Sequence, residues 1–187
     1  EKGRVILKAY FDAYKDEFIK PLFTEKFFGY SNGRIYLDDI ALNGKVDRID
    51  LIDPKTKSIR VVDYKTGKPK SRNEIEGKTK YSTGAYKRQL AFYKLLADLD
   101  RTFNFTVVEA QLDFVEPEKN GGFVRHSFSI SDEEILELKS LIKEVMAKIR
   151  SLEFPRTTDY KACTNCEYKA HCWPEGLPVG NQLELEV

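Results

Sequence analysis

Two acidic side chains occupy positions from which they could hold a metal ion, with a lysine beside them. Alternate residues of a strand share one face. Asp63 and Lys65 end an expected strand over 59–66 and continue the face of its apolar residues. By the same rule, Asp47 shares a face with apolar residues of the expected strand 45–53. If the two strands pack into one core, Asp47 lies beside Asp63 at the end of the sheet.

Carboxylates at the rim of a core destabilise the fold unless something compensates them. A hard divalent cation would do so, because Mg²⁺ is usually held by one or two carboxylates, waters and phosphate oxygens. Such an ion activates water and offsets charge in phosphoryl chemistry. The Lys65 ammonium could orient the attacking water or stabilise negative charge. The plain alternative is an Asp–Lys pair on a solvated strand face, since charged residues are mostly exposed.

A polar pair follows on an expected helix over 84–100. Gln89 and Tyr93 are four residues apart, and Tyr86 precedes Gln89 by three, so all three can share one face. A Gln side chain can hydrogen-bond a base or phosphate, and a Tyr ring can stack on a base. The alternative is a surface Gln and a core Tyr.

The three cysteines cluster near the end of the chain, as Cys163-x2-Cys166-x5-Cys172, in an expected Cys-rich knot over 156–176. An odd, clustered count suits a metal or cluster site better than a disulfide framework. It also favours a reducing, cytoplasmic location. Zinc with His171 as fourth ligand is one alternative, although His171 directly precedes Cys172. Three free thiols are the other.

Length and composition indicate a folded domain of ordinary size. The chain has 187 residues, of which 41% are hydrophobic and 33% charged, and it starts at Glu1, so we expect a fragment of a longer chain. No apolar run approaches the roughly 20 residues that span a bilayer, which excludes a membrane-spanning protein.

A local basic segment stands out against the net charge of +1. Between Lys65 and Arg88 there are eight Lys or Arg and two Glu, so attraction to nucleic acid would come from this patch. Residues 67–83 lack an apolar period and are expected to form a long mobile loop. Its basic residues Lys68, Lys70 and Arg72 are DNA-binding candidates.

Hydrophobic patterning predicts the elements that position these residues. Helices are expected over 4–20, 84–100 and from a Ser131–Glu134 capping box to before Pro155. Strands are expected over 25–30, 34–42, 45–53, 59–66, 105–115 and 122–130, with Asn43-Gly44 as a hairpin turn. The last helix carries one apolar face, formed by Ile135, Leu138, Leu141, Ile142, Val145, Met146 and Ile149.

Three motifs come in the order and spacing of the RecB-like PD-(D/E)xK nucleases, which the chain resembles over about residues 20–175. They are Gly-Lys-Val-Asp-Arg-Ile-Asp at 44–50, Val-Val-Asp-Tyr-Lys-Thr-Gly at 61–67 and Gln-Leu-Ala-Phe-Tyr at 89–93. The first two look most like the nuclease domains joined to UvrD/Rep- or AddB-type helicases. The CRISPR-associated RecB-like nucleases are a less close resemblance.

The resemblance implies an α/β fold with a restriction-endonuclease-like core, in which helices flank a mixed central sheet. It implies one nuclease domain over 1–187 that cleaves DNA phosphodiesters with Mg²⁺ or Mn²⁺. Asp47 and Asp63 would be metal ligands, with the backbone carbonyl of Tyr64 as a further ligand. Lys65 would be the catalytic lysine.

The resemblance also implies roles for neighbouring residues. Gln89 and Tyr93 would form the family's Q-x-x-x-Y motif, which contacts DNA or supports the metal site. Asp50 lies on the opposite strand face from Asp47, so we expect it to pair with Arg48 or to be a mere neighbour rather than a ligand. Glu25 precedes a strand, as an acid often does in this family, and a surface charge is the alternative.

Two departures from the family pattern concern metal ligands. The family usually has a His on its first helix, whereas this chain has only His171 and His126, which we expect to be packed in a strand. We expect the missing His upstream of Glu1 or absent. The Cys spacing resembles the iron–sulfur subset, in which a fourth Cys precedes the first helix. No such Cys is in this sequence, so a 4Fe–4S cluster would be incomplete in this chain.

The leading hypothesis is therefore a DNA nuclease that forms the C-terminal module of a helicase–nuclease in DNA repair or recombination. Its partners would be DNA and a helicase domain, in the same chain or in a partner subunit, with no membrane. The alternatives are a catalytically decayed DNA-binding or scaffold module, and a stand-alone CRISPR-associated nuclease. The intact Asp47, Asp63 and Lys65 favour the leading hypothesis over decay.

Overall fold

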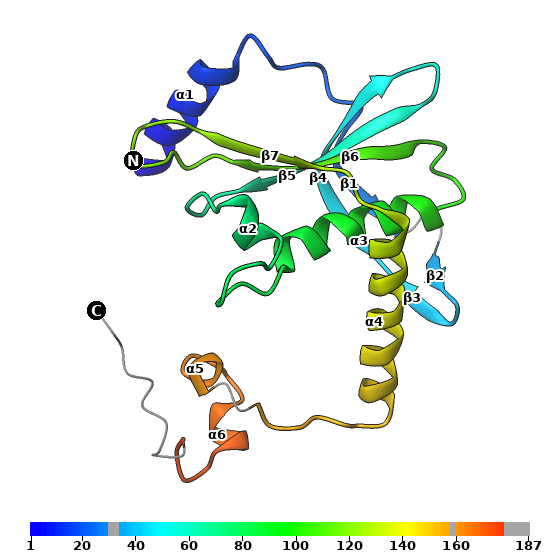
Figure 1. Ribbon diagram of the computed structural model, residues 1–187, viewed down its shortest axis with the longest axis vertical. Coiled ribbons are helices and arrows are strands. Elements are labelled where there is room, and N and C mark those ends of the chain that lie inside the picture. Colours follow the sequence, from blue (N-terminus) through cyan, green and yellow to red (C-terminus); the bar gives the residue numbers. More distant parts are fainter. Residues whose placement is uncertain (30–33, 158–159, 178–187) are drawn as a thin grey trace. The chain divides into compact units, whose positions relative to one another are not determined.

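The computed structural model describes residues 1–29, 34–157 and 160–177. The end of the predicted strand 25–30 and parts of the Cys-rich segment and tail lie outside these residues. In chain order the elements are α1 (Lys2–Tyr14), β1 (Phe23–Phe28), β2 (Ile35–Leu37), β3 (Ile40–Leu42), β4 (Gly44–Asp53), β5 (Ser58–Lys65), α2 (Arg72–Ile75), α3 (Ala85–Leu99), β6 (Thr106–Phe114), β7 (Val124–Phe128), α4 (Asp132–Arg150), α5 (Tyr160–Cys163) and α6 (Lys169–Cys172) (Figure 1). They form two compact units, residues 1–144 and the part from Val145 onward.

A five-stranded mixed sheet is the centre of the first unit. Its strand order is β1-β4-β5-β6-β7, in which β5 and β6 are parallel and the other pairs antiparallel. Parallel neighbours need a crossover connection, which here contains α2 and α3. The predicted α/β class, with a mixed sheet flanked by helices, is confirmed.

The two faces of this sheet differ in chemistry. Figure 1 shows α3 on one face and α1 toward the other. Under α3, the strands contribute Ile49, Ile59, Val61 and Leu112, all fully buried. Asp63 and Lys65 follow on this dry face, because they alternate with Val61 along β5. The opposite face carries polar residues, among which Asp50 and Asp113 are buried.

The entry into β4 differs from the predicted pattern. The expected strand 34–42 is instead a hairpin of β2 and β3, which turns at Asp38, a residue with φ of 55°. Asp tolerates this left-handed conformation better than most residues. Asn43-Gly44 is not a hairpin turn. Gly44 is explained by packing instead, because a Cβ there would lie 2.6 Å from the side chain of Leu96 on α3.

The segment 67–83 contains a helix that the sequence analysis missed. Ser71 and Glu74 form a capping box that starts α2, and Ile75 is 1% exposed. A single apolar residue, Ile75, creates no hydrophobic period, so the sequence pattern predicted a loop over the whole of 67–83. Gly77 and Gly84 both have positive φ, and a Cβ on Gly77 would lie 2.8 Å from the Gly84 nitrogen. The backbone therefore passes so close to itself at these two glycines that Gly77 has no room for a side chain.

Helix boundaries and burial also differ from expectation at both ends of the chain. The helix predicted over 4–20 ends at Tyr14. On α4, Ile135 and Leu138 are buried, whereas Leu141 is 39% exposed. The rest of the predicted face is exposed or half-buried.

The second unit contains two short helices and the three cysteines. The rings of Tyr160 and Trp173 lie 5.5 Å apart, edge to face, and the Arg156 guanidinium lies 5.1 Å from the Trp173 ring. Cys163 is buried, Cys166 exposed and Cys172 half-buried. In the described parts of both units, no helix is long and apolar enough to cross a bilayer.

We predict that Ile75→Ala destabilises the first unit by about 2–4 kcal/mol, because it removes a buried side chain and leaves a cavity. Urea unfolding monitored by circular dichroism measures this. The control is Tyr81→Ala in the same segment, where the side chain is 87% exposed and little change is expected. Equal stability of the Ile75 variant and the wild type would mean that the segment is not packed.

Candidate active site

Asp63 is the centre of the candidate site. It lies near the end of β5, and only 3% of it is exposed. Its Oδ1 accepts hydrogen bonds from Gln89 Nε2 at 3.0 Å and Tyr93 Oη at 2.7 Å. Its Oδ2 lies 2.6 Å from Lys65 Nζ, and among the described residues no donor makes a well-oriented hydrogen bond to it. Asp63 is thus held on one oxygen and paired by charge alone on the other.

Lys65 is fixed by contacts from two elements. Its ammonium donates to Gln89 Oε1 at 2.6 Å, besides pairing with Asp63. It also lies 4.6 Å from the centre of the Tyr86 ring, a cation–π arrangement. The side chain keeps 15% of its surface exposed, so the ammonium is positioned at the surface yet remains reachable.

The polar face of α3, which carries Gln89 and Tyr93, lies against the sheet as their spacing of four residues predicts. Gln89 bridges Asp63 and Lys65, and it also donates to Tyr93 Oη at 2.8 Å. The Tyr93 ring is 6% exposed, so it is not available to stack on a base. Burial, followed by the hydrogen bond to Asp63, raises the pKa of Tyr93 above its usual value, so the phenol stays a donor. Of the two implied roles, the structure favours support of the carboxylate.

Asp47 approaches Asp63 from the neighbouring strand. β4 and β5 pair Arg48 with Val62, and the next position in this register sets Asp47 opposite Asp63. The Asp47 Oδ2 accepts from the Tyr64 backbone N–H at 2.9 Å. Burial raises the pKa of Asp47, the Tyr64 hydrogen bond opposes this, and the charge of Asp63 raises it further. Two carboxylates of like charge are therefore held side by side.

Glu25 lies at the outer edge of this group. The register of β1 with β4 sets it opposite Asp47, and the regular pairing of the two strands skips this residue, whose φ is 52°. Its carboxylate forms an ion pair with Lys45, which shares the strand face of Asp47. The charge of Glu25 also raises the pKa of Asp47. Lys45 was missed by the sequence analysis, although strand parity with Asp47 could have indicated it.

These residues fit a hard divalent cation. Among the described residues, no three His, Cys, Asp or Glu side chains converge on one point, but Mg²⁺ needs only one or two carboxylates plus waters and phosphate oxygens. The buried Asp63 Oδ2 has no well-oriented hydrogen-bond donor, and the negative charge of Asp63 raises the pKa of the neighbouring Asp47. A cation between the two carboxylates would compensate both. Because the N–H and C=O of one strand residue point toward the same neighbouring strand, the Tyr64 carbonyl also faces β4.

The face opposite the carboxylates holds a second polar network. Arg48 Nε donates to Asp50 Oδ1 at 2.7 Å, which confirms the predicted partner of Asp50. Asp113 Oδ2 accepts from Tyr10 Oη at 2.5 Å and from Arg125 Nε at 2.9 Å. Burial raises the pKa of Asp113, while Tyr10 and Arg125 oppose the rise.

Sequence analysis missed this Asp113 group. The available signal was an Asp that stands between two apolar residues, Leu112 and Phe114, near the end of the strand.

The basic candidates differ in how free they are. Lys68 and Lys70 are exposed, with Lys70 Nζ 3.9 Å from Glu74. Arg72 instead donates to the Ser127 carbonyl at 3.1 Å and pairs with Glu76 at 3.2 Å. Its guanidinium also lies over an aromatic ring of β7. Arg72 therefore helps to hold α2 to the sheet, and because its side chain is still 53% exposed, its role as a DNA contact stays a prediction.

The two histidines lie in different units of the chain. The Nε2 of His126 lies 2.9 Å from the Lys70 carbonyl, and its ring lies near those of Phe114 and Phe128, as a packed histidine should. His171 lies on α6 in the second unit. In the described part of that unit, the three cysteines do not form a ready ligand set.

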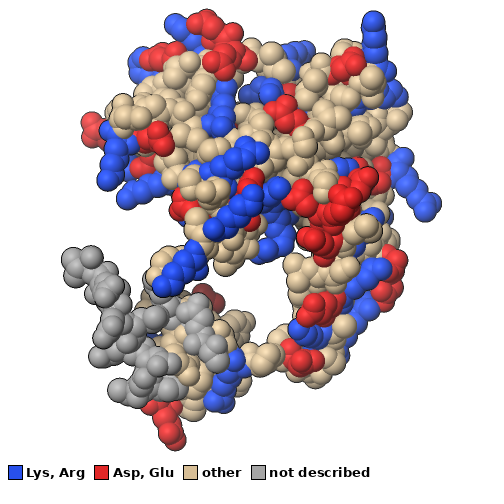
Figure 2. Space-filling view, in the orientation of Figure 1, with Lys and Arg blue, Asp and Glu red and all other residues tan. Residues whose placement is uncertain are grey.

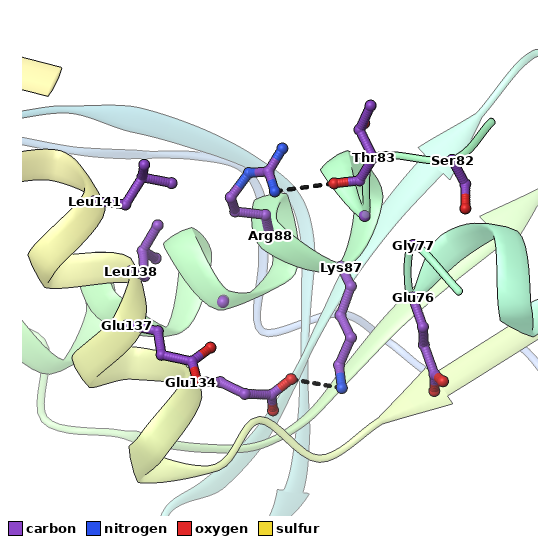
Figure 3. A pocket seen from close by; sticks show the side chains of 12 residues that line it. Glu76, Gly77, Ser82, Thr83, Lys87, Arg88, Glu134, Glu137, Leu138 and Leu141 are labelled. Atoms are coloured by element: carbon purple, nitrogen blue, oxygen red, sulfur yellow. Dashed lines mark hydrogen bonds and ion pairs between the residues drawn. The ribbon is translucent and has the colours of Figure 1, made fainter. Parts of the chain in front are cut away.

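A separate hollow of about 340 Å³ lies on the other side of α3 (Figure 3). The loop before α3, α3 and α4 line it, and Leu138 and Leu141 form its apolar wall. Both of its cations have partners, since Lys87 pairs with Glu134 at 2.6 Å and Arg88 donates to the Thr83 carbonyl at 3.0 Å. The candidate active site lies on the other side of α3, around Asp63.

Comparisons with known proteins give one family match and two structural similarities. A model of the PD-(D/E)XK nuclease superfamily matches residues 2–173. A crystal structure of a "Putative exonuclease" from Eubacterium rectale has 12% identity and a TM-score of 0.53, over 95% of this chain and 62% of that one. The crystal structure of SSO0001 has 15% identity and a TM-score of 0.49, over 83% of this chain. The chain thus spans 62% of the length of both solved structures. The search of curated proteins found no match.

We predict that Asp47→Asn stabilises the metal-free chain at pH 7. The pKa of Asp47 is raised in the fold, so its ionised form destabilises the fold above that pKa, and the amide oxygen can still accept from Tyr64. The gain should be less than about 1 kcal/mol, because water screens a partly exposed carboxylate. It should vanish at a pH low enough to protonate the wild type.

Urea unfolding in EDTA measures the difference in unfolding free energy between Asp47→Asn and the wild type. Asp53→Asn, at the other end of β4, is the control with the opposite sign, because hydrogen bonds from Thr56 and Lys55 lower the pKa of Asp53. Adding Mg²⁺ should stabilise the wild type and not Asp47→Asn. A loss of stability of Asp47→Asn in EDTA would contradict the prediction.

Proposed function

The chain belongs to the PD-(D/E)XK nuclease superfamily, and on this premise we propose that it is a metal-dependent nuclease that hydrolyses DNA phosphodiesters. The observation that carries the proposal is the assembly at the end of β5. There Asp63 and Lys65 are 2.6 Å apart, Gln89 bridges them, and Asp47 lies alongside. A decayed site would have lost one of these groups.

The residues divide the work of phosphodiester hydrolysis between them. Asp47, Asp63 and the Tyr64 carbonyl would hold Mg²⁺ or Mn²⁺, which supplies Lewis-acid activation of the phosphate and of water. Lys65 would donate a hydrogen bond to the attacking water or to a phosphate oxygen, where charge develops. Gln89 keeps the Lys65 ammonium and the Asp63 carboxylate in register, so that neither has to be ordered when substrate binds.

The basic segment supports nucleic acid as the substrate. It begins directly after Lys65, so its cations lie next to the site. Figure 2 shows Lys and Arg side chains gathered over α2 and the loop that follows it. Lys68, which precedes α2 in the sequence, and Lys80, which follows it, are both exposed. Such a local patch attracts a phosphate backbone even when the net charge of the protein is near zero.

The sequence motifs support a helicase-associated module of DNA repair or recombination, with a helicase domain in the same chain or in a partner subunit. A stand-alone CRISPR-associated nuclease remains the second candidate, favoured by the same motifs at lower similarity. The 4Fe–4S cluster remains a prediction from the Cys spacing. The described residues supply three thiols that do not converge, so no step of the mechanism involves a cluster.

We predict that Lys65→Met lowers the rate of cleavage of labelled single-stranded DNA in Mg²⁺ by about 10²–10³-fold, the usual effect of removing a donor that stabilises transition-state charge. Stabilisation by Mg²⁺ in thermal unfolding should persist. Lys55→Met, in the turn before β5, is the matched control and should cleave normally. Equal rates for both variants would remove Lys65 from the mechanism, and an inactive wild type in Mg²⁺ and Mn²⁺ would overturn the proposed function.

We predict that Lys68→Gln with Lys80→Gln weakens DNA binding and flattens its salt dependence. Each lost phosphate contact lowers the slope of log K against log salt by about 0.7–0.9, so the double variant should lose about 1–2. Anisotropy of a fluorescent oligonucleotide in EDTA measures this without cleavage. Lys55→Gln with Lys57→Gln removes the same charge at the far end of β5 and should leave the slope unchanged. The same slope for both pairs would place DNA elsewhere.

A further inference from the structure

Tyr64 connects the two faces of the sheet at the site. It stands between Asp63 and Lys65, and its side chain projects to the opposite face because neighbouring strand residues alternate. Its backbone N–H donates to Asp47 Oδ2 at 2.9 Å. A contact that fixes the Tyr64 side chain therefore also fixes two backbone groups at the site. One is the N–H that donates to Asp47, and the other is the Tyr64 carbonyl, itself a candidate metal ligand.

Arg48 holds the other end of the Tyr64 side chain. Its Nη1 donates to Tyr64 Oη at 3.1 Å. The guanidinium is itself fixed, because its Nε donates to Asp50 Oδ1 at 2.7 Å and its Nη2 donates to the Ile19 carbonyl at 3.4 Å. Asp50 is 1% exposed. A planar guanidinium with three separate acceptors has little freedom to move.

The contacts form one chain of bonds through the sheet, from Asp50 through Arg48 and Tyr64 to Asp47. We propose that Arg48 and the Tyr64 hydroxyl are positioning residues, which set the geometry of the metal-binding group from the opposite face. This inference rests on the proposed function.

The physical reason is the narrow tolerance of the metal. Mg²⁺ demands near-ideal octahedral geometry with ligands at about 2.0–2.1 Å. Without its hydroxyl contact, Tyr64 could shift on the far face, and its peptide units would move with it. Loss of groups that orient metal ligands typically lowers metal affinity by about 10–100-fold. A contact one step further removed should fall at the low end of that range.

The test is Mn²⁺ binding to the 187-residue chain by titration calorimetry, without nucleic acid, so that the readout does not depend on activity. Tyr64→Phe removes only the hydroxyl and should weaken Mn²⁺ binding about 10-fold. Arg48→Lys keeps a charge beside Asp50, cannot donate to all three acceptors, and should show a similar loss. Thermal unfolding of each variant reports its fold separately.

Tyr10→Phe is the matched control. It also deletes one buried hydroxyl on the same face, where Tyr10 donates to Asp113 at 2.5 Å. Within the described part of the chain, however, the Tyr10 hydroxyl makes no hydrogen bond to β4 or β5. We expect it to lower the unfolding temperature and to leave Mn²⁺ affinity unchanged.

The outcomes separate this inference from the proposed function. If Tyr64→Phe binds Mn²⁺ as tightly as the wild type, the positioning role is overturned while the nuclease proposal stands. If Tyr10→Phe weakens Mn²⁺ binding as much as Tyr64→Phe does, the effect is a general loss of rigidity and the inference fails. If the wild type binds no Mn²⁺, the proposed function fails and takes this inference with it.

Discussion

The buried carboxylate of Asp63 is the constraint on which the site depends. A charge held in a low-dielectric environment destabilises a fold by several kcal/mol, of order 3–5 when its partner is removed. The fold meets this with Lys65 two residues along the strand and with two donors from α3. Those donors reach Asp63 only if α3 docks in one rotation and one register, so a single carboxylate fixes how the helix sits on the sheet.

The sheet separates two tasks between its faces. The face under α3 is dry up to Asp63, which keeps water from weakening the interactions there. The other face carries charged groups, among them Arg48 and Asp113, which have hydrogen-bond partners in the second polar network. Buried ion pairs add little net stability compared with apolar packing. Their value here lies in geometry, since they restrict the backbone that presents the chemical groups on the first face.

Strand parity was enough to predict that Asp47 and Asp63 would meet, and helical spacing was enough to bring Gln89 and Tyr93 to them. Other features needed information that the local sequence does not hold. Ile75 is the only apolar residue that α2 buries, so its sequence shows no hydrophobic period. Gly44 follows an Asn, so a glycine required by close packing was predicted to be part of a hairpin turn. Asp113 stood out as polar, but its partners come from α1 and β7, which lie far from it along the chain.

The parallel pairing of β5 with β6 has a consequence for the order of folding. The β4–β5 hairpin is local and closes early, whereas β6 can pair with β5 only after the whole connection through α2 and α3 has closed, and such non-local pairings form slowly. Gln89 and Tyr93 belong to that connection, so Asp63 gains its partners late. A nascent chain that still lacks α3 therefore has Asp63 without the two donors that hold its carboxylate in the finished fold.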